Sequence, residues 1–264
     1  MSDNSEDEDK ESLYIEFNDY LTNESFKTML EERKNSLKCL HVEDGYNLND
    51  TSLKYLRICQ QLEELSIRYA CNMGKSGVAS LSQLSKLRIL TLNNAQELNE
   101  DHFISLFSNR NLENLEQLKL HRCVSLKEKA MQTIALNCPK LKYLDLNECF
   151  HISNQGIKFL IEHLPKLCYL NVYDCWKIKN SYLKEVIKES KIDLEIVNRK
   201  GGSIMFDIAS KQYSCNYADD DGSESDENQS LLKASRTAGF GILEVHVCAP
   251  VNDGGLDAEA SDDS

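Results

Sequence analysis

The apolar residues of this chain follow one spacing, L-x-x-L-x-L with Val or Ile allowed at the last position. The spacing returns in copies that begin at Leu37, Leu62, Leu87, Leu115, Leu141 and Leu167. Successive starts therefore lie 25, 25, 28, 26 and 26 residues apart. Self-similarity at a fixed period of this size is typical of proteins built from stacked repeats. Such repeats bury their leucines against one another and leave one long face exposed to partners.

Each copy predicts the same two elements. The L-x-x-L-x-L motif predicts a short strand whose alternate residues point into the core. A polar segment and a helix follow, with apolar residues at three- and four-residue spacing. Examples of this helical spacing are Phe103/Leu106/Phe107, Ala130/Ile134, Ile157/Leu160/Ile161 and Leu183/Val186/Ile187. The predicted fold class is α/β: a curved solenoid with parallel strands on its concave face and helices on its convex face.

The N-terminal end departs from the repeat pattern. Residues 1–12 are acidic and lack periodicity, so we expect them to be disordered. Residues 13–36 contain apolar residues at helical spacing from Phe26 to Leu30. We expect this segment to form a helical cap, because a solenoid must keep its terminal leucines out of water.

The C-terminal end also changes in character. We expect the repeat domain to span residues 37–213, with six full repeats and a degenerate seventh copy near Leu194. A last strand is expected at Ile204-Met205-Phe206-x-Ile208. Residues 214–264 are acidic and are expected to form a mostly disordered tail, with an apolar island at residues 239–250.

Charge is concentrated at the two ends of the chain. The net charge is −13, of which residues 1–12 contribute −5 and residues 214–264 contribute −10, so the repeat body is close to neutral. Acidic ends repel phosphate backbones, so we expect no nucleic-acid partner. The N-terminus has no apolar run that would make a secretory signal, and no stretch reaches the roughly 18 apolar residues of a membrane helix. We therefore expect a cytoplasmic or nuclear monomer that does not bind membranes.

The cysteines favour packing over chemistry. Cys123, Cys149 and Cys175 each lie three residues after the last strand residue of their motif, so they are expected to stack between repeats. A buried free cysteine behaves as a small hydrophobe. No CxxC pair accompanies them, so we expect no metal and no cofactor.

Catalytic motifs are not found. The histidines are scattered, and Gly201-Gly202 lacks the Gly-Lys-Ser/Thr that completes a phosphate-binding loop. We expect no enzymatic activity and assign no catalytic residue.

The later copies resemble the cysteine-containing subclass of leucine-rich repeats, L-x-x-L-x-L-x-x-C-x-x-[IL]-[ST]-[DN]-x-G-[IL]. The fullest match runs from Leu141 to Ile157, LKYLDLNECFHISNQGI, and Cys138-Pro139 precedes it where the subclass joins helix to strand. The resemblance covers roughly residues 37–198. The subclass is best known from F-box leucine-rich-repeat proteins, the substrate receptors of cullin–RING ubiquitin ligases. It also occurs without an F-box, in proteins of the antagonist of mitotic exit network type.

The resemblance implies a non-enzymatic scaffold for protein–protein interaction, linked to ubiquitin-ligase substrate recognition. Only 36 residues precede the first copy, and they contain no L-P-x-x-[LIV] start, so we expect no F-box. Two alternatives stay open. The first is a nuclear protein whose acidic tail binds basic partners such as histones, and the second is an assembly factor of the mitochondrial leucine-rich-repeat type.

Aromatic and basic residues gather on the later strands of the expected concave face. Tyrosine and tryptophan anchor interfaces because they bury a large area while keeping a polar group. We predict that a protein partner binds this face, and ubiquitin-ligase components or their substrates are candidate partners. The residues predicted to contact the partner are Lys119, His121, Arg122, Tyr143, Asp145, Tyr169, Asn171, Tyr173 and Trp176. The competing interpretation is that these aromatic residues only cover the strands. In the tail, candidate phosphorylation sites precede acidic residues at Ser223, Ser225 and Ser261.

Overall fold

The structure is a computed structural model that describes residues 11–16, 21–189, 194–197, 203–207 and 212–215. These residues belong to the first of two compact units, Met1–Ser225. The second unit, Asp226–Ser264, lies outside the described residues, as do Ser223 and Ser225.

The described strands form one sheet whose spatial order follows the chain. They are β1 (Ser12–Ile15), β2 (Cys39–Val42), β3 (Glu64–Ile67), β4 (Ile89–Leu92), β5 (Gln117–Lys119), β6 (Tyr143–Asp145), β7 (Tyr169–Asn171), β8 (Leu194–Val197), β9 (Ser203–Asp207) and β10 (Gln212–Cys215). Neighbours from β1 to β8 pair in parallel, whereas β9 pairs antiparallel with both β8 and β10.

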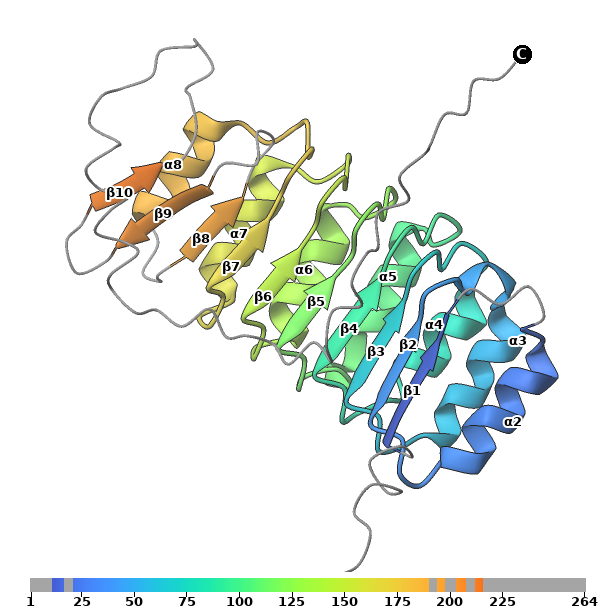
Figure 1. Cartoon of the computed structure of the whole chain (residues 1–264). Helices are drawn as coiled ribbons and strands as arrows, with labels where there is room; N and C mark the ends of the chain where they lie inside the picture. Colours follow the sequence, from blue (N-terminus) through green and yellow to red (C-terminus); the bar gives the residue numbers. More distant parts are fainter. Residues whose placement is uncertain (1–10, 17–20, 190–193, 198–202, 208–211, 216–264) are drawn as a thin grey trace, which may run out of the picture. The chain divides into compact units, whose positions relative to one another are not determined.

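Helices connect the parallel strands and cover one side of the sheet (Figure 1). They are α2 (Asn23–Arg33), α3 (Asp50–Leu53), α4 (Lys75–Leu81), α5 (Glu100–Phe107), α6 (Glu128–Asn137), α7 (Asn154–His163) and α8 (Asn180–Glu189). Short 3-10 turns occur at η1 (Gly45–Asn47), η2 (Lys54–Ile58) and η3 (Ser108–Arg110). The opposite side of the sheet, which we call the strand face, is not covered by these helices.

The core lies between the sheet and the helices and is built from the repeated leucines. The central leucines of the motifs pair in register across the sheet, from Leu40 to Leu65 and onward to Leu170, and all are buried. The helices contribute the apolar residues expected of them. In α7, for example, Ile157 and Leu160 are completely buried, and the helix begins where the Ser153 hydroxyl accepts a hydrogen bond from the Gly156 N–H.

Some helix starts are also tied to the preceding repeat. Asp50, the first residue of α3, accepts hydrogen bonds from the N–H groups of Gly74, Ser76 and Gly77 at 2.8, 3.0 and 2.8 Å. Burial acts to raise the pKa of Asp50, but these three backbone bonds outweigh it and hold the pKa below its usual value. Asn154 plays the same part with a neutral side chain, because its Oδ1 accepts from the Lys179 N–H at 3.2 Å just before α8.

The chain leaves the strands through a repeated turn. In each of five such turns, one residue has a positive φ, between 52° and 59°. These residues are Tyr69, Asn94, Arg122, Glu148 and Asp174. The next residue is always small or a cysteine and is buried: Ala70, Ala95, Cys123, Cys149 or Cys175. Each turn therefore directs a compact side chain into the core at the end of its strand.

The three repeated cysteines fill this core position, as the sequence predicted. Their thiols donate to backbone carbonyls of the preceding repeat: Cys123 to Leu92, Cys149 to Leu120 and Cys175 to Leu146, at 3.3, 3.0 and 3.1 Å. Burial raises the pKa of the Cys123 and Cys175 thiols to about 12, and it also raises the pKa of Cys149. The thiols therefore stay protonated, weakly bonded and unreactive.

The prediction for residues 13–36 was wrong at its start, because β1 precedes the helix. Leu13 and Ile15 take the inward positions of a strand that pairs in register with β2, so the segment forms a short extra repeat rather than only a helical cap. The expectation that residues 1–12 are disordered was also wrong for the last two residues of that range. Ser12 lies in β1, and the Glu11 carboxylate binds the Lys38 ammonium at 2.7 Å.

The expected end of the repeat domain at residue 213 falls inside β10. Ser214 and Cys215 continue the antiparallel pairing of β10 with β9, because the sheet does not stop at the change in composition. The expected strand at Ile204–Phe206 is present as β9, and Ile208 lies outside the described residues. The apolar island at 239–250 also lies outside them. The predicted α/β architecture of stacked leucine-rich repeats is confirmed.

Candidate functional site

Columns of aligned side chains run across the strand face, because β2 to β8 pair in one continuous register. The tyrosine column, as we call it, consists of Cys39, Glu64, Ile89, Gln117, Tyr143, Tyr169 and Glu195. A second column, two residues later on each strand, consists of His41, Ser66, Thr91, Lys119, Asp145, Asn171 and Val197.

Two tyrosines stack at the centre of the candidate site. The ring centroids of Tyr143 and Tyr169 are 4.3 Å apart, and the ring planes differ by 5°. The Lys119 ammonium lies 5.5 Å from the centroid of the Tyr143 ring, which is a cation–π distance. β5, β6 and β7 thus present a cation and two aromatic rings in one row, and three of the predicted site residues lie together.

Both tyrosine hydroxyls stay neutral at physiological pH. Burial is the first cause that raises the pKa of Tyr143 and of Tyr169, and the nearby carboxylates of Asp145 and Glu195 raise both values further. A neutral phenol donates a hydrogen bond and offers an apolar ring, which is the combination that favours tyrosine at protein interfaces.

Asp145 and Asn171 shape the ends of their strands. The Asp145 carboxylate accepts the Asn147 N–H at 2.9 Å, and the Asn171 side-chain oxygen accepts the Tyr173 N–H at 2.9 Å. These local bonds fix the turn after each strand. Asp145 also lies opposite Lys119 in register, but the Lys119 ammonium contacts the Tyr143 ring and makes no ion pair with Asp145.

His121 and Arg122 bind an acidic neighbour rather than forming an open basic cluster with Lys119. The Glu148 carboxylate accepts from His121 Nε2 at 2.9 Å and from Arg122 Nε at 3.0 Å. Glu148 lies in the following repeat, so it balances the positive charge expected at this place. A direct role of these two residues in binding remains a prediction.

Tyr173 and Trp176 lie beyond the strand. Tyr173 is half-buried, and its carbonyl accepts the Glu148 N–H at 2.9 Å. Trp176 follows the buried Cys175 in the loop and packs on Phe150, with ring centroids 5.4 Å apart. Trp176 is 66% exposed, the largest exposure among the exposed large apolar residues of the described chain. The structure therefore places Trp176 on the loop side of the site rather than in the tyrosine column.

The structure contains a column of alternating charge that was not predicted from the sequence. The residue after the first leucine of successive motifs is Lys38, Glu63, Arg88, Glu116 and Lys142, and Glu11 precedes β1 at the matching position. Ion pairs link Lys38 to Glu11 at 2.7 Å, Arg88 to Glu63 at 3.6 Å, Arg88 to Glu116 at 3.2 Å and Lys142 to Glu116 at 2.8 Å. The alternation of sign at the repeat period was visible in the sequence.

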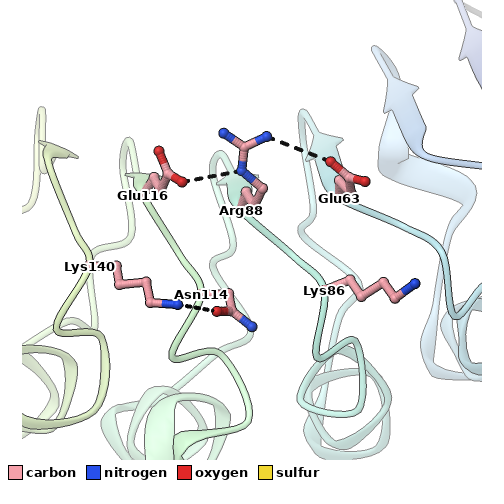
Figure 2. A pocket seen from close by; sticks show the side chains of 6 residues that line it. All are labelled: Glu63, Lys86, Arg88, Asn114, Glu116 and Lys140. Carbon is pink, nitrogen blue, oxygen red and sulfur yellow. Dashed lines mark hydrogen bonds and ion pairs between the residues drawn. The ribbon is translucent and has the colours of Figure 1, made fainter.

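Figure 2 shows part of this charged column around a shallow recess of about 250 Å³. Arg88 reaches Glu116 on one side and Glu63 on the other, and Lys140 donates to the Asn114 side chain at 2.6 Å. The hydrogen bond from Lys142, together with Arg88, lowers the pKa of Glu116. Because the charges of Glu63, Arg88, Glu116 and Lys142 bind one another, the recess links neighbouring repeats.

A second stacked tyrosine pair was also missed. Tyr46 lies in η1 after β2 and Tyr69 lies in the turn after β3, with ring centroids 4.7 Å apart and planes 18° from parallel. Their side chains are 48% and 37% exposed. The sequence spacing separates them by 23 residues, so no single column revealed the contact.

Metal-ligating clusters and membrane-spanning helices are both absent from the described ranges. Within these ranges no group of three or more His, Cys, Asp or Glu side chains is arranged to hold a metal ion. No helix in the same part of the chain combines the length and apolar character needed to cross a membrane.

Neither the protein-family models nor the curated proteins gave a match to this chain. Among solved structures, the Rad7 and Elc1 complex of yeast matches 67% of this chain at 17% identity, with a TM-score of 0.46. An internalin (inlF) from Listeria monocytogenes matches 60% at 17% identity, with a TM-score of 0.40. The matches span 54% and 46% of those chains, about half of their length.

Proposed function

We propose that this chain is a non-enzymatic scaffold that binds a protein partner on the strand face over β5 to β8. The observation that carries the proposal is the row of Lys119, Tyr143 and Tyr169. Stacked aromatic rings beside a cation are a typical binding anchor, because they bury a large area with few freely rotating bonds. The helices lie on the other side of the sheet (Figure 1), and Lys119, Tyr143 and Tyr169 are each only half-buried.

The finer part of the proposal is a link to ubiquitin-ligase substrate recognition. Its support is the cysteine-containing repeat motif, which is fullest from Leu141 to Ile157. The buried free thiols of the repeats also suit a reducing compartment, in line with a cytoplasmic or nuclear protein.

The test is capture of partners by the tagged full chain from its own cells. Three forms are compared: the unmodified chain, the double variant Tyr143→Ala plus Tyr169→Ala, and the control Tyr46→Ala plus Tyr69→Ala. The control also removes two stacked tyrosines, but from the loops. We expect the first double variant to lose at least nine-tenths of a specific protein partner, while the control retains it.

Thermal unfolding of all three forms shows whether each variant is folded. Equal recovery by a folded Tyr143/Tyr169 variant would contradict the proposed binding face. The finer proposal has its own outcome. Recovery of a Skp adaptor or a cullin with the unmodified chain supports the ligase link, and partners without any such component count against it.

A further inference from the structure

The tyrosine column ends in a pair with different chemistry from the rest. Glu195 on β8 lies directly opposite Tyr169 on β7. One face of the Tyr169 ring is covered by Tyr143, whereas Glu195 is the neighbour of Tyr169 on the β8 side, and its charge acts on the Tyr169 hydroxyl. An aromatic ring and a neighbouring carboxylate are two groups that can bind a cation lying between them.

At the other end of the same row, a cation already lies over a tyrosine ring. There the Lys119 ammonium occupies the β5 side of the Tyr143 ring. The chain thus supplies its own cation at one end of the tyrosine stack and a carboxylate at the other. A cation between Tyr169 and Glu195 would complete the row symmetrically, with ring stacking and charge attraction acting together.

The carboxylates around Tyr169 are not neutralised by this part of the chain. Neither Asp145 nor Glu195 takes part in an ion pair among the described residues. Glu64, the matching glutamate at the other end of the tyrosine column, is bound by His41 Nε2 at 3.2 Å and contacted by the Cys39 thiol at 4.0 Å. Within the tyrosine column, Glu195 is therefore the glutamate without an ion pair among the described residues.

We propose that the strand face over β6–β8 binds a basic side chain of the protein partner, with its cation between the Tyr169 ring and the Glu195 carboxylate. This inference rests on the proposed function and specifies the chemistry of its partner. Arginine fits better than lysine, because its planar guanidinium can stack on the ring and bind the carboxylate through two N–H groups. The same carboxylates repel phosphate groups, so the site favours a basic peptide over a nucleic acid.

The experiment selects peptides from a random 12-residue library displayed on phage, with the full chain as the target. We expect binders to share one arginine or lysine position. Replacing that residue with alanine should weaken binding at least tenfold, measured by fluorescence anisotropy of the labelled peptide. Glu195→Gln should weaken binding about tenfold, because it removes the charge and keeps the shape.

Glu64→Gln is the matched control, because it removes a glutamate from the same column that is already paired. Its effect should stay within twofold. When the peptide selection is repeated with the Glu195→Arg variant as the target, the shared position should change from basic to acidic residues. Higher salt should weaken binding to the unmodified chain more than binding to Glu195→Gln.

Two results would overturn the inference. The first is a selection that gives no binders, or binders without a basic position. The second is an equal loss for Glu195→Gln and Glu64→Gln. If Tyr143→Ala plus Tyr169→Ala abolishes binding but Glu195→Gln does not, the proposed binding face stands and only the basic partner is rejected.

Discussion

The two ends of the tyrosine column share a backbone and differ in chemistry. On β2 and β3 the polar groups bind one another, as Glu64 does with His41. On β6 to β8 the column presents two stacked rings and the Glu195 carboxylate, which has no ion pair in the described chain. Because the register is continuous from β2 to β8, the difference comes from the outward side chains alone. In this fold the buried leucines set the structure, and the outward columns are free to specify binding.

The largest expected effect tests whether both ends share one kind of core. Leu65→Ala and Leu144→Ala each remove a completely buried leucine from equivalent positions, one at each end. Each should lower the free energy of unfolding by about 2–5 kcal/mol, through lost burial and the cavity left behind. Urea unfolding followed by circular dichroism measures the loss. A cost at one position and almost none at the other would contradict a common core.

A smaller effect concerns the pH dependence of stability, which should differ between the two ends of the repeat array. Asp50→Asn should cost about 1 kcal/mol at pH 7, because it weakens three hydrogen bonds to the start of α4. The folded pKa of Asp50 is lowered, so its contribution is present above the unfolded pKa of about 3.9 and is lost as the pH falls through the folded value. The stability difference between the variant and the unmodified chain should therefore shrink below about pH 4.

Asn154→Ala provides the neutral counterpart at the other end. It removes the bond to the Lys179 N–H, and its smaller cost should not change between pH 7 and pH 4. Thermal unfolding across this pH range compares the two variants. A pH-independent cost for Asp50→Asn would show that its charge does not stabilise α4.

The smallest effect concerns the charged column. Glu116→Gln weakens the contacts with Arg88 and Lys142, and we expect a loss of less than about 1 kcal/mol because these groups are partly exposed. The loss should fall when salt is raised from 50 to 500 mM. Glu113→Gln is the control, because the exposed Glu113 makes no ion pair within the described residues. A loss that does not respond to salt would mean that packing, rather than charge, links these repeats.

Much of the fold was predictable because its signal is local and repeated. The leucine spacing alone placed β2 to β7, and the buried cysteines followed from their fixed position after each strand. β1 was missed because Leu13 and Ile15 form only half of the motif. Its strand state depends on pairing with β2, which a single segment does not reveal.

The candidate site was predictable in part. Reading down each column correctly aligned Tyr143 with Tyr169, because the register keeps columns straight. The same method missed diagonal contacts such as His121 with Glu148 and Tyr46 with Tyr69, which join different columns of neighbouring repeats. The placement of the Lys119 ammonium over a ring, rather than on Asp145, depends on side-chain conformation and required the structure.

The most direct test of the central claim is oxidative footprinting of the full chain, with and without a partner captured by it. Mass spectrometry then reports the modification rate of each tyrosine. The proposed binding face predicts that the partner slows modification of Tyr143 and Tyr169 several-fold and leaves the rates of Tyr46 and Tyr69 unchanged. Protection of Tyr46 and Tyr69 with unchanged rates at Tyr143 and Tyr169 would contradict it.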